Sequence, residues 1–100
     1  MMKYPKIKSV KPLQNKRLWV EFDQGVEKIY DCSPLLQITA FEPLRQEWFF
    51  DSVQVDAGGY GISWSDEIDL AESELWLNGI AVAPASEAEL MQFRTVSVSH

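Results

Sequence analysis

The chain has 100 residues, of which 46% are hydrophobic and 24% charged. This composition excludes a disordered tail and a collagen-like chain, and the length fits one small domain and not a two-domain enzyme. The formal net charge of −6 counts against a nucleic-acid-binding module, which usually has a basic balance over the whole domain.

The N-terminal third predicts antiparallel strands. Residues 7–10 form a short β-prone segment, and residues 14–16 provide a turn. Over residues 18–23, Leu18, Val20 and Phe22 alternate with the residues between them. A period of two is that of a strand with one buried face. Gly25 suits the left-handed position of a tight turn. Residues 26–31 then return as the partner strand of a first hairpin.

Two short helical segments are expected next. Ser33 is a natural N-cap and Pro34 suits the first helical position, where its missing N–H costs nothing. Pro43 begins the second segment. Leu44 and Trp48, four residues apart, are expected on one face of it.

A second hairpin is predicted around the turn Ala57-Gly58-Gly59. Its strands are expected over 52–56 and 60–64, with Tyr60, Ile62 and Trp64 on one face.

The closing helix is expected to run from Asp69 to about Asn78. Glu72, three residues after Asp69, completes the pattern of a capping box, and Gly79 is a natural residue for the helix end with positive φ. The order of strands, short helices, strands and helix predicts an α+β domain over residues 1–79, an antiparallel sheet of two hairpins with a closing helix. Residues 80–100 are a C-terminal extension, either a packed helix or a tail.

No residue pattern indicates an enzyme or a cofactor. Cys32 has no cysteine partner, and Asp31 beside it discourages thiolate chemistry. The only histidine, His100, ends the sequence. The acids over 66–74 lack the alternating spacing of a calcium loop, so we expect no metal site. Gly58 to Gly61 lack the ending of a phosphate-binding loop.

Charge is distributed unevenly along the chain. Residues 1–28 contain seven lysines and arginines against three acids, whereas residues 29–90 contain one arginine against twelve acids. In one interpretation the two regions lie together and partly neutralise each other. In the other, the basic face contacts nucleic acid or the acidic face contacts a basic protein. The predicted partner-binding residues are Trp19, Glu67, Glu72 and Glu74.

The ordered pattern of core and turn residues resembles a small bacterial family of domains of unknown function, number 2442. The residues that carry the resemblance are Val10, Pro12, Leu13, the run Leu18-Trp19-Val20-Glu21-Phe22, Gly25, Tyr30-Asp31, Leu35-Leu36, Phe41, Leu44, Phe50, Val53, Trp64, Ile68-Asp69-Leu70 and Leu75-Trp76. The resemblance implies an α+β fold, a stand-alone cytosolic protein, and genes paired in toxin–antitoxin style. It supplies no catalytic residues.

Two functions are therefore kept open. The first is a non-enzymatic, cytoplasmic interaction protein, antitoxin-like or regulatory, that binds a small protein or associates with itself through its acidic middle or an exposed sheet edge. The second is a nucleic-acid-associated protein that uses the basic N-terminal strand and Trp19 for backbone contacts and stacking. No membrane association is expected, because no apolar run approaches the ~18 residues of a membrane span.

Overall fold

The computed structural model describes residues 4–82, which form two antiparallel sheets and two α-helices. The first sheet, sheet A, has the strand order β1 (Ile7–Leu13), β2 (Arg17–Phe22), β3 (Glu27–Asp31), β7 (Ile80–Ala81). The second, sheet B, has the order β4 (Gln54–Val55), β5 (Gly61–Ser65), β6 (Ile68–Ala71). This architecture confirms the predicted α+β class.

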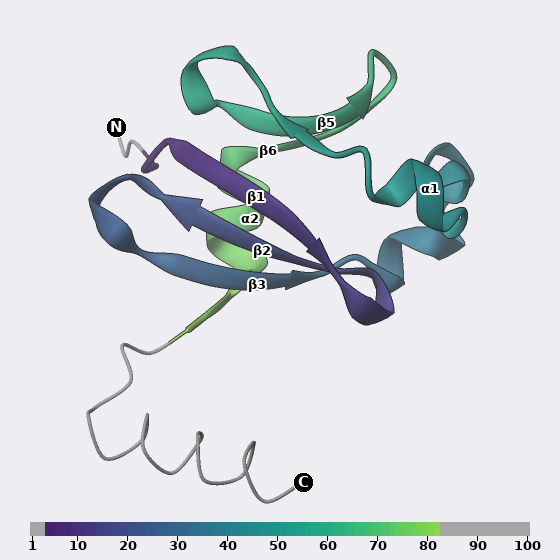
Figure 1. Ribbon diagram of the computed structural model, residues 1–100, viewed down its shortest axis with the longest axis horizontal. Coiled ribbons are helices and arrows are strands. Elements are labelled where there is room, and N and C mark those ends of the chain that lie inside the picture. The colour runs from purple at the N-terminus through teal and green to yellow at the C-terminus, as the bar shows by residue number, and fades with distance from the viewer. Residues whose placement is uncertain (1–3, 83–100) are drawn as a thin grey trace, which may run out of the picture.

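The helices occupy different sides of the molecule. Helix α2 (Glu72–Asn78) lies behind sheet A, whereas α1 (Glu47–Phe50) lies beyond one end of the strands (Figure 1). Two 3₁₀ segments, Ser33–Gln37 and Thr39–Arg45, connect β3 to α1. Among residues 4–82, no helix is long and apolar enough to span a bilayer.

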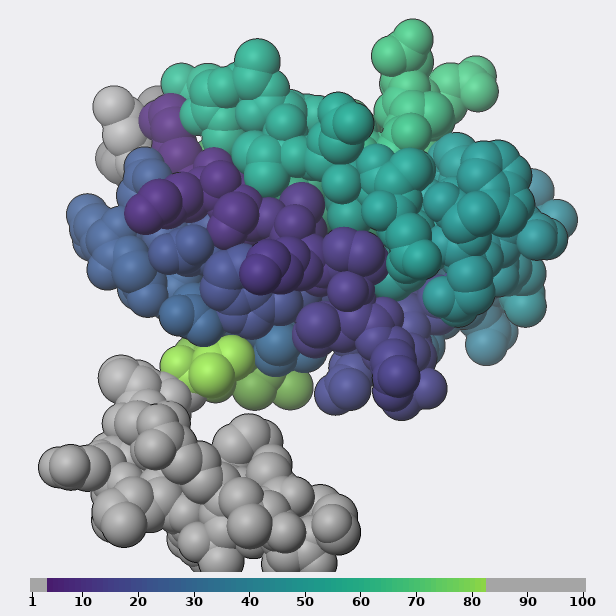
Figure 2. All heavy atoms as spheres, in the orientation of Figure 1, coloured from purple at the N-terminus to yellow at the C-terminus, as the bar shows by residue number. Residues whose placement is uncertain are grey.

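One core lies between sheet A, sheet B and α2. From β2, the alternating residues Leu18, Val20 and Phe22 are fully buried, and Leu75 of α2 packs with them. The Phe22 ring meets Trp76 of α2 edge to face, with ring centroids 5.1 Å apart. The other face of sheet A is the front surface of β1 to β3 in Figure 2, and no other described element covers it.

The predicted turns of both hairpins are confirmed. Gly25 has φ +82 at the β2–β3 turn, and Gly58 has φ +83 between β4 and β5. Strand β1 is longer than predicted, because it continues through Pro12 to Leu13. A proline is tolerated there because β1 is an edge strand, where no ladder hydrogen bond from its nitrogen is needed.

The predicted start of the closing helix is wrong. Asp69 is not an N-cap but lies in β6, paired with Ser63 of β5, and α2 begins only at Glu72. Buried Ile68 and Leu70 alternate with exposed Asp69, which is strand periodicity. The N–H of Glu72 is satisfied by the carbonyl of Tyr60, at 3.0 Å, and not by a capping side chain.

The predicted positive φ of Gly79 is also wrong, since its φ is −76 and ψ 151. A glycine is needed there for space: a Cβ would lie 2.5 Å from the carbonyl oxygen of Leu75 and 3.1 Å from Cβ of Lys28.

Two predicted helical or strand faces differ from the structure as well. Trp48 is 73% exposed, whereas Leu44 is buried, because extended backbone at Gln46 separates the two helical segments and destroys their four-residue relation. Tyr60 is exposed in the turn, although Ile62 and Trp64 are buried in β5 as expected. Ser33 begins its 3₁₀ segment, but the cap position is Cys32. Residues 83–100 of the predicted C-terminal extension lie outside the described residues.

Candidate partner-binding site

A pocket of about 680 Å³ opens at the outer edge of β3. We call it the β3–α2 pocket. It lies between β3, the 3₁₀ segment Ser33–Gln37 and the C-terminal end of α2. The residues that line it are Arg17, Ile29, Tyr30, Asp31, Pro34, Leu35, Glu74, Asn78 and Ile80.

The pocket exists because β7 is shorter than β3. Strand β7 pairs only with Lys28 and Ile29. The N–H of Val82 donates to the carbonyl of Glu27 at 2.9 Å, so Glu27 directs its backbone groups toward β7. These directions alternate along an antiparallel strand, and Asp31 therefore directs its N–H and C=O to the same side. At Asp31 no β7 residue is opposite, which leaves this stretch of the edge open.

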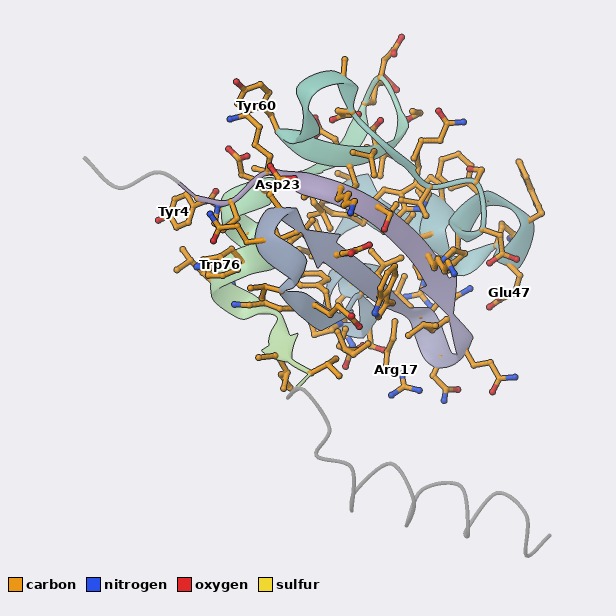
Figure 3. The ribbon with its side chains drawn as sticks, turned by 60° about the vertical axis from the view of Figure 1, so that its left-hand side comes forward. Tyr4, Arg17, Asp23, Glu47, Tyr60 and Trp76 are labelled. Atoms are coloured by element: carbon orange, nitrogen blue, oxygen red, sulfur yellow. The ribbon has the colours of Figure 1, made fainter. Side chains whose placement is uncertain are left out.

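The Asp31 carboxylate is held at the pocket by its neighbours. Its Oδ1 accepts the N–H of Ser33 at 2.9 Å. This bond, helped by the Ser33 hydroxyl and then by the charge of Arg17, holds the pKa of Asp31 below its usual range. Arg17 is the cross-strand partner of Asp31 on β2, and its Nε donates to the carbonyl of Gln14 at 3.3 Å. Figure 3 shows Arg17 directed away from the sheet into solvent.

On the opposite wall of the pocket, a hydrogen bond connects β3 to α2. The hydroxyl of Tyr30 donates to Oε2 of Glu74 at 2.8 Å, across 44 residues of chain. Burial of Tyr30, and then this bond to a carboxylate, raise the pKa of its phenol well above the usual range. Tyr30 therefore stays neutral and acts as a donor.

Three exposed apolar side chains lie in the segment that runs from the end of α2 through β7. Leu77 of α2 is 62% exposed, Ile80 of β7 76%, and Val82 43%. These three large side chains lie within six residues of chain, and Ile80 is the one that lines the pocket. We call the pocket and these three side chains together the docking surface.

The four residues predicted from the sequence do not form one surface. Glu74 lines the pocket, and Glu72 lies at the start of the same helix. Glu67 is exposed in the turn between β5 and β6. Trp19 projects from the face of sheet A opposite α2, where its Nε1 donates to Glu27 at 2.9 Å.

Sequence reasoning missed the pocket residues Arg17, Tyr30, Asp31 and Ile80 as site candidates. The pattern correctly predicted a strand for Tyr30 and Asp31, but strand periodicity does not say which part of an edge remains uncovered. The one local signal was the pair Asp31 and Ser33, whose spacing is typical of a side chain that bonds the backbone two residues later.

The basic side chains of residues 4–82 are all engaged within the molecule. Each of the seven lies against an aromatic ring, a carboxylate or a backbone carbonyl. The contacts are Lys6 with the Tyr60 ring, Lys8 with Glu21, Lys11 with the Trp19 ring, Lys16 with Glu47, Arg17 with the Gln14 carbonyl, Lys28 with the Trp76 ring and carbonyl, and Arg45 with the Leu36 carbonyl.

Acids outnumber these cations. Residues 4–82 contain thirteen acidic side chains against the seven basic ones. Within that part of the chain, no three or more histidine, cysteine, aspartate or glutamate side chains lie close enough together to hold a metal ion.

A comparison with protein families decides the identity of the domain. The model of the family described as "Protein of unknown function (DUF2442)" matches residues 7–81. The chain belongs to the DUF2442 family. No curated protein and no solved structure matches it.

The DUF2442 match places the candidate site within the family domain. Residues 7–81 include all strands and helices of the structure and every residue that lines the β3–α2 pocket. The pocket is therefore part of the DUF2442 fold of this chain and not of an appended segment.

Proposed function

We propose that this DUF2442 protein is a non-enzymatic interaction protein that binds a small protein partner on the docking surface. The observation that carries the proposal is the exposure of Leu77, Ile80 and Val82, of which Ile80 lines a pocket together with Asp31 and Glu74. Single exposed apolar residues are ordinary, but a group of them beside a concave site is typical of a protein interface.

The nucleophilic groups support a binding role over a catalytic one. Cys32 is fully buried, and burial followed by the charge of Asp31 raises the pKa of its thiol to about 12. A thiol in this state is a poor nucleophile at neutral pH. The only histidine of the sequence, His100, lies outside the described residues.

The charge arrangement favours a protein partner over nucleic acid. Lysines and arginines that bind phosphates release counterions and give most of the affinity for DNA. Here all seven basic side chains of residues 4–82 already contact rings, acids or carbonyls. The Trp19 ring, the other element of a nucleic-acid surface, has the Lys11 ammonium 5.5 Å from its centroid.

The family resemblance suggests the role that this chain has toward its partner. We propose a cytoplasmic, antitoxin-like or regulatory role, in which this chain holds a second small protein. A second copy of the chain is the competing occupant of the docking surface.

Photo-crosslinking within the native host tests the proposal. Benzoylphenylalanine replaces Ile80 in the full chain, and in a matched control it replaces Gln54, which is exposed on β4 of sheet B. We expect a crosslink from position 80 to one small protein, identified by mass spectrometry, and none from position 54. Both variants should keep the melting midpoint of the parent chain, because both positions are exposed.

Other results contradict the proposal in different ways. Crosslinks from position 80 only to residues 83–100 of the same chain would mean that the docking surface is an internal contact. Crosslinks to a second copy would replace the partner by self-association. A stable complex with DNA at physiological salt, tighter than the ordinary nonspecific Kd of about 10⁻⁴ to 10⁻⁶ M, would favour the nucleic-acid function.

A further inference from the structure

We infer that the β3–α2 pocket accepts the side chain of a lysine or arginine from the partner, an inference that rests on the docking function proposed above. The pocket presents hydrogen-bond acceptors and negative charge at its polar wall, and apolar groups elsewhere. That combination matches a long aliphatic side chain with a cationic end.

The acceptors come from three residues. The Asp31 carboxylate uses Oδ1 for the Ser33 N–H, and the Glu74 carboxylate uses Oε2 for the Tyr30 hydroxyl. The Ser33 hydroxyl also acts on the Asp31 carboxylate, whereas the Tyr30 hydroxyl is the one side-chain donor to Glu74 among residues 4–82. Asn78, whose side-chain amide can accept a hydrogen bond, lines the same pocket.

The balance of charge selects a cation. The residues that line the pocket include two acids, Asp31 and Glu74, and one base, Arg17. An anionic ligand would be repelled by two charges and attracted by one. A cationic ligand would be attracted by two charges and repelled by one. Hydrogen bonds from an ionised donor to a carboxylate are also about twice as strong as neutral ones.

The remaining walls suit an aliphatic stem. Ile29, Pro34, Leu35 and Ile80 line the pocket, and the methylene groups of lysine and arginine pack well against such side chains. The volume of about 680 Å³ lies within the range of ligand sites, about 300 to 1,000 Å³. Arginine is also enriched among the residues that contribute most to protein interfaces.

A small probe tests the chemistry without the partner. Benzamidine, a cationic amidinium on an apolar ring, is titrated into the full chain while backbone amide chemical shifts are recorded. Neutral benzamide and anionic benzoate are the matched controls. We expect saturable shifts at Asp31, Leu35 and Asn78 with benzamidine only.

Three variants distinguish the pocket from a general charge effect. Asp31→Asn and Glu74→Gln should each weaken benzamidine binding by about fivefold, the loss expected for one partly exposed charge pair. Glu74→Gln keeps an acceptor for Tyr30, so its fold should be retained. Arg17→Gln should strengthen binding, because it removes the competing cation, and a damaged fold would not produce that change. Asp51→Asn, at the end of α1, should leave the affinity unchanged.

Several outcomes would overturn the inference. Preferential binding of benzoate that is lost in Arg17→Gln would show an anion pocket. Equal binding of benzamide would show a purely apolar one. If benzamidine causes no shifts but position 80 still forms its crosslink, the pocket does not accept a basic side chain, and the proposed docking function is unaffected. Benzamidine binding without that crosslink would instead support the pocket chemistry and overturn its use by a protein partner.

Discussion

Cys32 shows how one buried residue responds to its surroundings. It follows β3 and has no exposed surface, and burial together with the nearby Asp31 charge raises the pKa of its thiol from 9.0 to about 12. We predict that an aromatic disulfide reagent leaves the thiol of the folded protein unmodified at neutral pH and reacts with it after denaturation. Rapid reaction in the folded state, followed by absorbance, would contradict this burial.

The same residue predicts a dependence of stability on alkaline pH. The unfolded chain loses the thiol proton near pH 9, whereas the folded chain keeps it until about 12. The contribution of Cys32 to the free energy of unfolding is therefore complete below pH 9 and is lost as the pH rises toward 12. Cys32→Ala should reduce the slope of stability against pH, measured by denaturant unfolding. Tyr30, whose pKa is also raised, should account for the slope that remains.

Gly79 and Gly25 are predicted to respond differently to the same substitutions. Gly79→Ala forces a Cβ against the Leu75 carbonyl and should cost about 1–3 kcal/mol by overpacking. Gly25→Ala meets no atom within 4 Å but has a strained positive φ, which costs roughly 1 kcal/mol.

Asparagine separates these two causes. Gly25→Asn should be better tolerated than Gly25→Ala, because asparagine adopts the left-handed region more readily. Gly79→Asn should be at least as damaging as Gly79→Ala. The free energies of unfolding are measured by chemical denaturation. Equal losses for Gly25→Asn and Gly79→Asn would contradict the assignment of a conformational cause to Gly25 and a steric cause to Gly79.

At the scale of elements, α2 depends on the residues before it. It has only seven residues, and isolated helices below about 12 residues are marginal in water. Its stability therefore comes from packing of Leu75 and Trp76 against sheet A and from the bond that the Glu72 N–H donates to the Tyr60 carbonyl.

The assignment of β6 can be tested by paired substitutions. Leu70 is buried and should cost about 2–5 kcal/mol when replaced by alanine. Asp69→Ala should change the free energy of unfolding by less than about 0.5 kcal/mol, because the exposed side chain does not cap α2. If Asp69→Ala lowers the free energy of unfolding by about 1 kcal/mol in thermal or denaturant unfolding, Asp69 caps a helix and the assignment of β6 is wrong.

For the whole molecule, the shared core predicts a single unfolding transition. Ile7 of β1 is buried in the same cluster as Ile62 of β5 and Leu75 of α2. Tryptophan fluorescence, which reports on Trp64 stacked with Phe50 and on Trp76 against Phe22, should therefore coincide with circular dichroism.

A substitution in β1 should move both signals together. Ile7→Ala should destabilise the protein by about 2–5 kcal/mol, whereas the exposed neighbour Lys8→Ala should have little effect. Two separate midpoints, or a shift in only one signal, would mean that the sheets unfold independently.

The sequence by itself determined the α+β class, both hairpin turns and the buried face of β2. These features depend on neighbours in the chain: alternation at Leu18, Val20 and Phe22 needs only a period of two, and Gly25 needs only a local positive φ. The family pattern belongs to this group, since it consists of core and turn positions.

Only the tertiary structure decided where α2 begins, why residue 79 is glycine, and where the candidate site lies. The segment Ile68–Ala71 became a strand because β5 was available to pair with it. Gly79 is required by a carbonyl and by Lys28, which is 51 residues away. The pocket depends on β7 beginning only at Ile80, opposite Ile29, and on the hydrogen bond between Glu74 and Tyr30. Contacts between distant segments set these features, and no local periodicity records such contacts.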